Sequence, residues 1–432
     1  MASEWTIASL EDCMAVIIDY RGKTPQKTSS GIPLITAKVV KGGRIETPDE
    51  FIAEEDYSNW MRRGMPQAGD VIVTTEAPLG EVAQLGGGRL ALAQRLIALR
   101  GKPHVLDNTY LKFLMQSEGV QAQLRARSSG TTVFGIKQSE LRKITLTIPS
   151  IPEQHAIAHA LGTLDDKIEL NWRMNETLEA MAQALFKSWF VDFDPVRAKA
   201  EGRDPGLSRH LADLFPDSFE QPGLGEIPKG WRITPLPEVV EVNPLRTVGR
   251  GEVAPYLDMA NMPTEGHSPD AVVDRAFSSG MRFVNGDTLV ARITPCLENG
   301  KTAYVDFLRD GQVGWGSTEF IVLRPKPPLP TEYAYCLARS AEFRDFAIQS
   351  MTGSSGRQRV PSDSLAQFEI AVPSEKVAGK FSYLVEPLFA RAKAASEQCR
   401  VLAALRDALL PRLISGEIRL ADIEGRLGGS HA

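Results

Sequence analysis

The chain has 432 residues, enough for two to four domains that each bury a core. With 43% hydrophobic and 24% charged residues its composition is that of an ordinary globular protein, and no apolar run approaches the roughly 20 residues of a membrane span. The first residues lack the basic and apolar regions of a signal peptide, so we expect a cytoplasmic protein without a membrane partner.

The net charge of -5 is concentrated in one part of the chain. Residues 151–228 hold 7 Lys and Arg against 14 Asp and Glu, a local net charge of -7. The rest of the chain is close to neutral, so charge neither supports nor excludes a nucleic-acid partner. Four scattered cysteines without a CxxC pair indicate reduced thiols and argue against a zinc site.

Residues 1–150 are expected to form a mixed α/β domain. Short β-rich runs such as 70–75 are interrupted by Gly and Pro turns, and one helical stretch follows at 109–126. The runs carry polar and basic side chains beside apolar ones. We therefore expect such strands to be exposed on one face.

The next segment, 151–193, has the spacing of a coiled-coil helix. A helix of about 38 residues would rise about 57 Å. Asn171 and Asn175 are costly in an apolar seam, where polar residues usually fix the register. In an antiparallel pair they would lie near Cys399 and Ala395; divergence of the helices, or another subunit at this point, explains them equally well. The predicted seam comprises Ile157, Leu161, Leu164, Ile168, Asn171, Asn175, Leu178, Ala182, Leu185 and Trp189.

A Pro/Gly-rich linker is expected over 194–228, before a second α/β domain over 229–374. This second domain repeats the first. QRLIALRGKP at 94–103 aligns with TEFIVLRPKP at 318–327, an offset of 224, whereas the Gly-Asp pairs at 69–70 and 286–287 are offset by 217. A period this long indicates a duplicated domain and not a solenoid.

A second long helix is expected over 375–418, before a tail over 419–432. Adding 224 to the first seam gives a second one, apolar apart from Arg406. Two such helices, one closing each half of the chain, could pack together as a spacer. The second seam comprises Phe381, Val385, Leu388, Ala392, Ala395, Cys399, Leu402, Arg406, Leu409 and Leu413.

Catalytic motifs are missing from the sequence. There is no GxxxxGK[ST] phosphate loop, and the glycines at 86–88 lack the spacing of a dinucleotide site. His155 and His159 stand at i, i+4 without the HExxH glutamate, which favours a solvated helix face over a metal site. We therefore expect no catalytic residue, no metal site and no cofactor in this chain.

Two matching loops late in each α/β domain are the best candidates for ligand contact. Residues 125–132 with 137–138 correspond to 352–359 one repeat later, and both combine Gly, Ser or Thr with Arg, Lys or Gln. Hydroxyl groups and backbone N–H groups suit phosphates, Arg suits guanine and Gln suits adenine. A solvated turn explains either loop alone. The candidates are Arg125, Arg127, Ser128, Ser129, Thr131, Thr132, Lys137, Gln138, Thr352, Ser354, Ser355, Arg357, Gln358 and Arg359, with Lys38, Lys41, Arg44, Arg62, Arg63, Arg292 and Lys301 as weaker ones.

Four stretches carry a resemblance to a known family. They are GEIPKGW at 225–231, IP through PEQ at 148–154, LFKSWFVDF at 185–193 and LLPRLISGE at 409–417. With the duplication, they resemble the specificity subunit of type I restriction-modification enzymes. Ser3-Glu4-Trp5 replaces the Pro-Lys-Gly-Trp approach at the first domain, which affects only its expected start.

The resemblance implies two target-recognition domains separated by two long antiparallel helices. Each domain would read one half of a bipartite, asymmetric site in double-stranded DNA. The helices would set the spacer and dock two methyltransferase subunits, with restriction/translocase subunits added outside. S-adenosylmethionine, ATP and Mg²⁺ are then expected on those partners. The alternatives are an assembly scaffold that reads no sequence, and the specificity half of a single-chain restriction-methylation enzyme.

Overall fold

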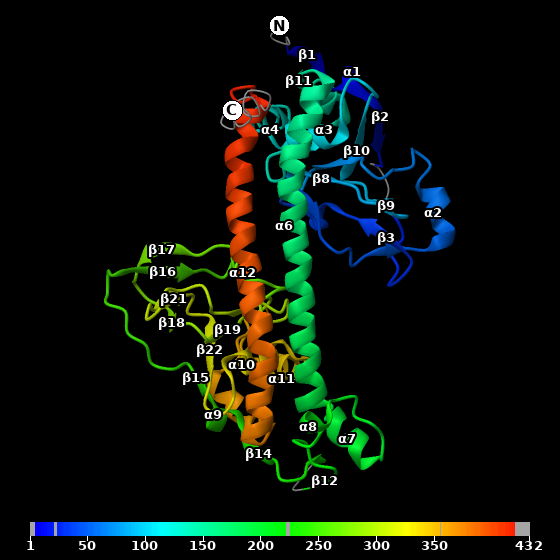
Figure 1. The fold of residues 1–432 in the computed structure, drawn as a ribbon. Helices are drawn as coiled ribbons and strands as arrows, with labels where there is room; N and C mark the ends of the chain where they lie inside the picture. Colours follow the sequence, from blue (N-terminus) through cyan, green and yellow to red (C-terminus); the bar gives the residue numbers. More distant parts are fainter. Residues whose placement is uncertain (1–4, 21–23, 222–224, 355, 420–432) are drawn as a thin grey trace, which may run out of the picture. The chain divides into compact units, whose positions relative to one another are not determined.

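The computed structural model describes residues 5–20, 24–221, 225–354 and 356–419 (Figure 1). Residues 420–432 of the expected tail and the candidate Ser355 lie outside them. The chain divides into a first unit, residues 1–168 with 401–432, and a second unit, residues 169–400. Both boundaries fall inside long helices, so each long helix contributes one part to each unit.

The first unit is built on an antiparallel sheet with the strand order β2–β10–β7–β8. A smaller sheet has the order β6–β3–β9, in which β3 and β9 are parallel. Two further pairs are β1 with β11 and β4 with β5. The strands are β1 (Thr6–Ser9), β2 (Met14–Asp19), β3 (Ile32–Ile35), β4 (Val40–Lys41), β5 (Arg44–Ile45), β6 (Phe51–Ile52), β7 (Val71–Thr75), β8 (Leu79–Gln84), β9 (Ala91–Leu92), β10 (Leu96–Gly101) and β11 (Thr145–Ile148). The helices are α1 (Leu10–Cys13), α2 (Glu54–Trp60), α3 (Asn108–Gln116), α4 (Glu118–Ala126) and α5 (Gln138–Leu141), with a 3₁₀ turn at Ala37–Val39.

The second unit repeats this topology. Its main sheet has the order β15–β22–β19–β20, its opening and closing strands pair as β14 with β23, and β16 pairs in parallel with β21 in the sheet β17–β16–β21–β18. The strands are β14 (Arg232–Pro235), β15 (Val240–Val242), β16 (Val253–Leu257), β17 (Val273–Ala276), β18 (Met281–Phe283), β19 (Thr288–Ala291), β20 (Thr302–Tyr304), β21 (Gly314–Gly316), β22 (Phe320–Pro325) and β23 (Glu369–Val372). The helices are α9 (Leu236–Val239), α10 (Thr331–Arg339) and α11 (Ala341–Gln349), with a 3₁₀ turn at Ser362–Gln367. The mixed α/β class and the internal repeat are confirmed. The expectation that the β-rich runs are exposed on one face is wrong for β7 and β19, in which every residue is buried, because other parts of each unit cover both faces of these central strands.

The repeated block around Arg100 supports the main sheet of the first unit. Arg100, at the end of β10, donates to the buried carboxylate of Asp70 at 2.7 and 2.8 Å. Asp70 also accepts from the Gln67 N–H, which closes the turn before β7. Lys102 reaches back to the Asp12 carbonyl at the end of α1. These repeated charges therefore tie strands and turns together within the domain.

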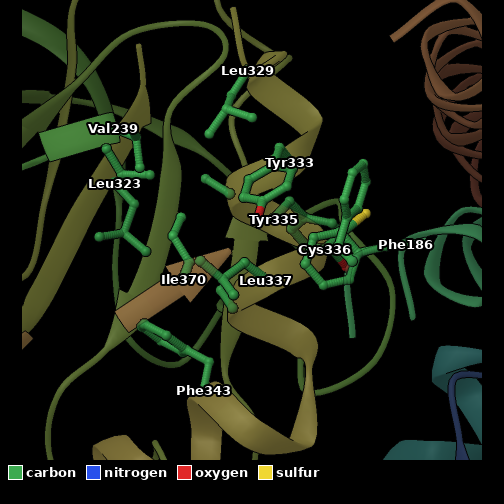
Figure 2. Close-up of a cluster of buried hydrophobic side chains, with 14 of the residues drawn as sticks. Phe186, Val239, Leu323, Leu329, Tyr333, Tyr335, Cys336, Leu337, Phe343 and Ile370 are labelled. Carbon is green, nitrogen blue, oxygen red and sulfur yellow. The ribbon is translucent and has the colours of Figure 1, made fainter. Parts of the chain in front are cut away.

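Aromatic side chains fill the core of the second unit. Figure 2 shows Tyr333 and Tyr335 of α10 among Phe186, Leu323 and other apolar side chains. Both tyrosines are buried, and burial raises the pKa of each phenol above its usual value. The core thus joins the main sheet, α10 and the ends of the long helices within this unit.

The two long helices are α6 (Ile151–Phe186) and α12 (Glu375–Ile414). In the second unit Asn171 donates to Gln398 and Asn175 donates to Ser396, both at 2.9 Å. Residue numbers rise along one helix as they fall along the other, so the predicted antiparallel pairing is confirmed there. The contacts lie beside the buried Ala395 and Cys399.

Every residue of both predicted seams is buried or half-buried. In the first unit Arg406 donates to Asp165 at 2.8 Å, and Lys112 of α3 pairs with the same carboxylate. The charged interruption of the second seam is thereby neutralised. Trp189 lies beyond α6 in a π-helical turn, Lys187–Val191, and packs on Phe381.

The Pro/Gly-rich segment after α6 folds onto the second unit. It contains α7 (Asp194–Ala200), α8 (Arg209–Ala212) and the paired strands β12 (Phe219–Glu220) and β13 (Ile227–Pro228). Val196 and Phe215 are buried in that unit's core. Apolar side chains therefore give this segment a defined position, although its composition is typical of a linker.

Candidate nucleic-acid interface

The first candidate loop is a short hairpin. Ser129 and Gly135 exchange backbone hydrogen bonds of 2.9 and 3.0 Å, which closes the segment 130–134 into a tip. Thr131 and Thr132 are exposed at this tip, and Phe134 beside them is 58% exposed. Exposed hydroxyl groups at such a tip are suited to contacts with phosphate oxygens.

The corresponding loop of the second unit closes in the same way. Thr352 and Arg359 exchange two backbone hydrogen bonds of 2.9 Å. Ser354 and Arg357 are exposed inside the loop, and Gln358 is half-buried. The structure thus brings together the described candidates of this loop within one hairpin.

Each hairpin is anchored to the end of a central strand of its own unit. The Ile136 N–H donates to the Thr75 carbonyl at 3.0 Å, after the end of the first hairpin. In the second unit the Val360 N–H donates to the Arg292 carbonyl at 2.9 Å. Because β7 and β19 hold them, the hairpins occupy matching places in the two units.

Most of the predicted cations in the first unit have carboxylate partners. Lys38 lies 2.9 Å from Asp49, and this hydrogen bond is the main cause of the raised pKa of Lys38. Glu50 also pairs with Lys38, at 3.2 Å. Lys41 and Arg44 face Glu46 at 2.9 and 3.9 Å, Arg125 pairs with Glu118, and Arg127 lies 3.4 Å from Glu140. These cations would have to exchange a carboxylate for any phosphate.

The remaining candidates of the first unit have other surroundings. Arg63 donates to the Asp19 carbonyl at 2.9 Å, and Arg62 beside it is exposed. Ser128 donates to the Arg125 carbonyl at 2.7 Å. Lys137 is the exposed residue before α5, and Gln138 is the first residue of that helix.

In the second unit Lys301 has a structural position. Its ammonium group donates to the Met259 and Ala260 carbonyls at 2.6 and 3.2 Å. Arg292 is half-buried, and its Nε has no hydrogen-bond partner among the residues that the structure describes. Arg359 is held by Glu319, with Nε 2.9 Å from both carboxylate oxygens. Arg292 and Arg359 therefore come together around one hairpin, whereas Lys301 is engaged by backbone.

The sequence criteria above select neither Arg95 nor its partner Glu76. The guanidinium of Arg95 lies 2.9 Å from the Glu76 carboxylate, beside the first hairpin. A signal for this site does exist in the repeat. Within the block aligned at 224, Arg95 stands opposite Glu319, a reversal of charge in an otherwise matched stretch.

Within the described part of the chain no cluster of three or more His, Cys, Asp or Glu side chains could hold a metal ion. His155 lies 3.8 Å from Asp107, and both it and His159 are exposed. No helix among the described residues is long and apolar enough to cross a membrane.

The known proteins to which this chain is similar are specificity subunits of type I restriction enzymes. Residues 2–180 match the model of the type I restriction modification DNA specificity domain. The chain is 26% identical to the type I restriction enzyme MjaIX specificity subunit of Methanocaldococcus jannaschii, over 97% of this chain and 95% of that protein. It is 28% identical to the HindI specificity subunit of Haemophilus influenzae, over 68% of this chain and 73% of that protein.

A crystal structure of a type I restriction-modification S subunit from M. genitalium has a similar fold. The TM-score is 0.54 at 15% sequence identity, and the match covers 95% of this chain and 96% of that one. The similarity of fold thus extends over nearly the whole chain.

Proposed function

We propose that the chain is the DNA-reading subunit of a type I restriction-modification complex, since residues 2–180 match the specificity domain of that family. Its role is sequence recognition. Methyl transfer, translocation and cleavage are the work of partner subunits, which carry S-adenosylmethionine, ATP and Mg²⁺.

In this proposal each unit reads one half of a bipartite, asymmetric site in double-stranded DNA. The repetition of one sheet and one anchored hairpin in both units carries the proposal. A common frame with different loop residues is what two half-sites of different sequence require. Hydroxyl groups and cations at the hairpins suit phosphates, and Arg and Gln suit base edges.

The long helices act as the spacer and as the docking surface for two methyltransferase subunits. At 1.5 Å per residue, helices of 36 and 40 residues rise about 54 and 60 Å. Two half-sites on one face of DNA lie about one helical turn, roughly 34 Å, apart. Helices of this length are sufficient for that separation. Methylation of adenine by a partner requires the base to be flipped out, so the recognition surfaces have to accept distorted DNA.

A domain exchange tests this function. The complete complex, expressed in cells that lack other adenine methyltransferases, is used to map methylated adenines. Replacing residues 1–150 by the corresponding domain of a relative should change one half-site only. Replacing residues 229–374 should change only the other half-site.

Other results identify the alternatives. An unchanged methylation motif after both exchanges would support a scaffold that reads no sequence. S-adenosylmethionine binding or DNA cleavage by the isolated chain would support an enzyme with its own chemistry.

A further inference from the structure

The hairpin sites of the two units have the same backbone connections. The Thr75 N–H donates to the Arg95 carbonyl at 2.9 Å, and the Arg292 N–H donates to the Glu319 carbonyl at the same distance. Gly135 forms a β-bridge with Glu76, as Arg359 does with Ile293. With the anchoring bonds of Ile136 and Val360, these contacts make positions 75, 76, 95 and 135 equivalent to 292, 293, 319 and 359.

The charges at these equivalent positions are arranged differently. In the first unit the arginine is Arg95, in the loop before β10, and its carboxylate partner is Glu76. In the second unit the arginine is Arg359, on the hairpin, and Glu319 occupies the position of Arg95. Each site therefore keeps one Arg–Glu pair but presents its guanidinium from a different element.

Gly135 of the first hairpin leaves room for the side chain of Glu76. A Cβ atom added to Gly135 would lie 3.3 Å from the side chain of Glu76. In the second unit the equivalent position carries the arginine, and Ile293 replaces the glutamate. The two sites thus differ by a coupled set of residues on one backbone frame.

Exposure distinguishes these pairs from the charges that support the fold. Arg95 and Glu76 are 49% and 44% exposed, and Arg359 and Glu319 are 44% and 24% exposed. The pair Arg100–Asp70 in the first unit and the equivalent pair Arg324–Asp287 in the second unit instead have fully buried carboxylates. An exposed pair contributes little to stability, so its guanidinium can change partner at small cost.

We propose that Arg95 and Arg359 are specificity-determining residues, each of which reads a guanine in the half-site of its own unit. The inference rests on the proposed function. Arginine binds guanine O6 and N7 through two parallel hydrogen bonds, the same fork that it offers a carboxylate. Glu76 and Glu319 orient the guanidinium before DNA arrives. Because the two arginines come from different elements of the common frame, we expect the recognised guanine at a different position in each half-site.

Arginine-to-alanine variants of the complete complex test the proposal. Arg95→Ala should relax one guanine position in one half-site, with a loss of discrimination of about 5- to 150-fold in methylation of sites that carry another base there. Arg359→Ala should relax one position in the other half-site. The matched control is Arg89→Ala, which removes an exposed arginine paired with Glu54 elsewhere in the first unit and should leave the motif unchanged.

Three results would overturn the proposal. One is a motif that both variants leave intact. Another is an equal loss of binding affinity for all DNA sequences, together with a slope of log affinity against log salt concentration that is smaller by about one. That combination is the signature of a lost phosphate contact. If Arg95→Ala abolishes methylation altogether, Arg95→Lys decides, because lysine keeps the charge but not the bidentate fork. Full guanine specificity in Arg95→Lys is the third contrary result.

The outcome separates this inference from the proposed function. A wild-type complex that methylates no bipartite motif contradicts the proposed function itself. A wild-type complex with such a motif, together with variants that do not alter it, contradicts only the roles of Arg95 and Arg359.

Discussion

Asp287 is completely buried, and its carboxylate accepts a hydrogen bond from Arg324 at 3.1 Å. Arg246 approaches the same carboxylate at 3.4 Å, and the Val284 N–H donates to it at 2.8 Å. Burial nonetheless raises the pKa of Asp287 above its usual value. This aspartate therefore stabilises the turn before β19 through its partners.

Removal of this carboxylate should strongly destabilise the second unit. Asp287→Ala leaves Arg246 and Arg324 without their carboxylate, and breaking a buried pair costs about 3–5 kcal/mol. Urea unfolding measures the loss. The control Glu54→Ala removes an exposed partner of Arg89 and should cost no more than about 1 kcal/mol. Equal effects of the two substitutions would contradict a structural role for Asp287.

The Asn171–Gln398 contact should fix the register of α6 against α12 while lowering the free energy of unfolding. Asn171 is fully buried, and its Oδ1 has no hydrogen-bond partner among the described residues. Asn171→Leu should therefore raise the free energy of unfolding, by about 1 kcal/mol, since Gln398 remains exposed to water. Thermal unfolding of the variant checks this, and a lower melting temperature would show that the contact is stabilising.

The charges around Asp165 should behave as one group. Asp165→Ala leaves Lys112 largely buried without its carboxylate and leaves Arg406 with only the exposed Asp407, which should cost about 3 kcal/mol. Replacing Asp165, Lys112 and Arg406 by Leu, Met and Leu removes all three buried charges, leaves only the exposed Asp407, and should restore stability to within about 1 kcal/mol of the wild type. Denaturant unfolding of the single and triple variants distinguishes this from independent contributions, for which the triple variant would be the least stable.

A heptad inserted into each long helix should lengthen the spacer of the DNA site. Insertion after Ile168 and after Arg400 keeps the seam in phase and adds a rise of about 10 Å. Both half-sites should stay the same while the number of base pairs between them increases. The map of methylated adenines reads both properties, and an unchanged spacer would contradict the role of the helices as a ruler.

The cysteines should differ in reactivity. Cys13, Cys336 and Cys399 are buried, and burial raises the pKa of the Cys13 and Cys336 thiols, which disfavours the reactive thiolate. Cys296 is partly exposed. A maleimide should therefore label Cys296 first in the native protein, as mass spectrometry of its peptides would show. Rapid labelling of Cys336 without unfolding would contradict its burial.

Much of the architecture is predictable from local pattern and repetition. The four-three spacing around Leu161 and Val385 predicts long helices, and the block around Arg100 and Arg324 predicts two similar domains. Apolar periodicity is sufficient here, because a helix that buries one stripe needs only the right residue every third or fourth position. The segment around Val196 and Phe215 is different. Its Pro and Gly content is typical of a linker, but tertiary contacts give it helices and a buried face.

The candidate site was only partly predictable. The two hairpins are visible as matching Gly/Ser loops, since turn residues act locally. The partners of the charged side chains are not visible, because Glu76, Arg95 and the Gly135 backbone meet only when distant segments fold together.

The sequence by itself determined that the chain is duplicated, that each half ends in a long amphipathic helix, and to which family it is similar. Only the tertiary structure decided which repeated charges support the sheets and which stand exposed beside a hairpin. Arg100 and Arg95 lie five positions apart in one aligned block, yet one faces a buried aspartate and the other an exposed glutamate. The reason is physical: the energetic role of a charge depends on its burial and its partner, and both arise from contacts between segments far apart in the chain.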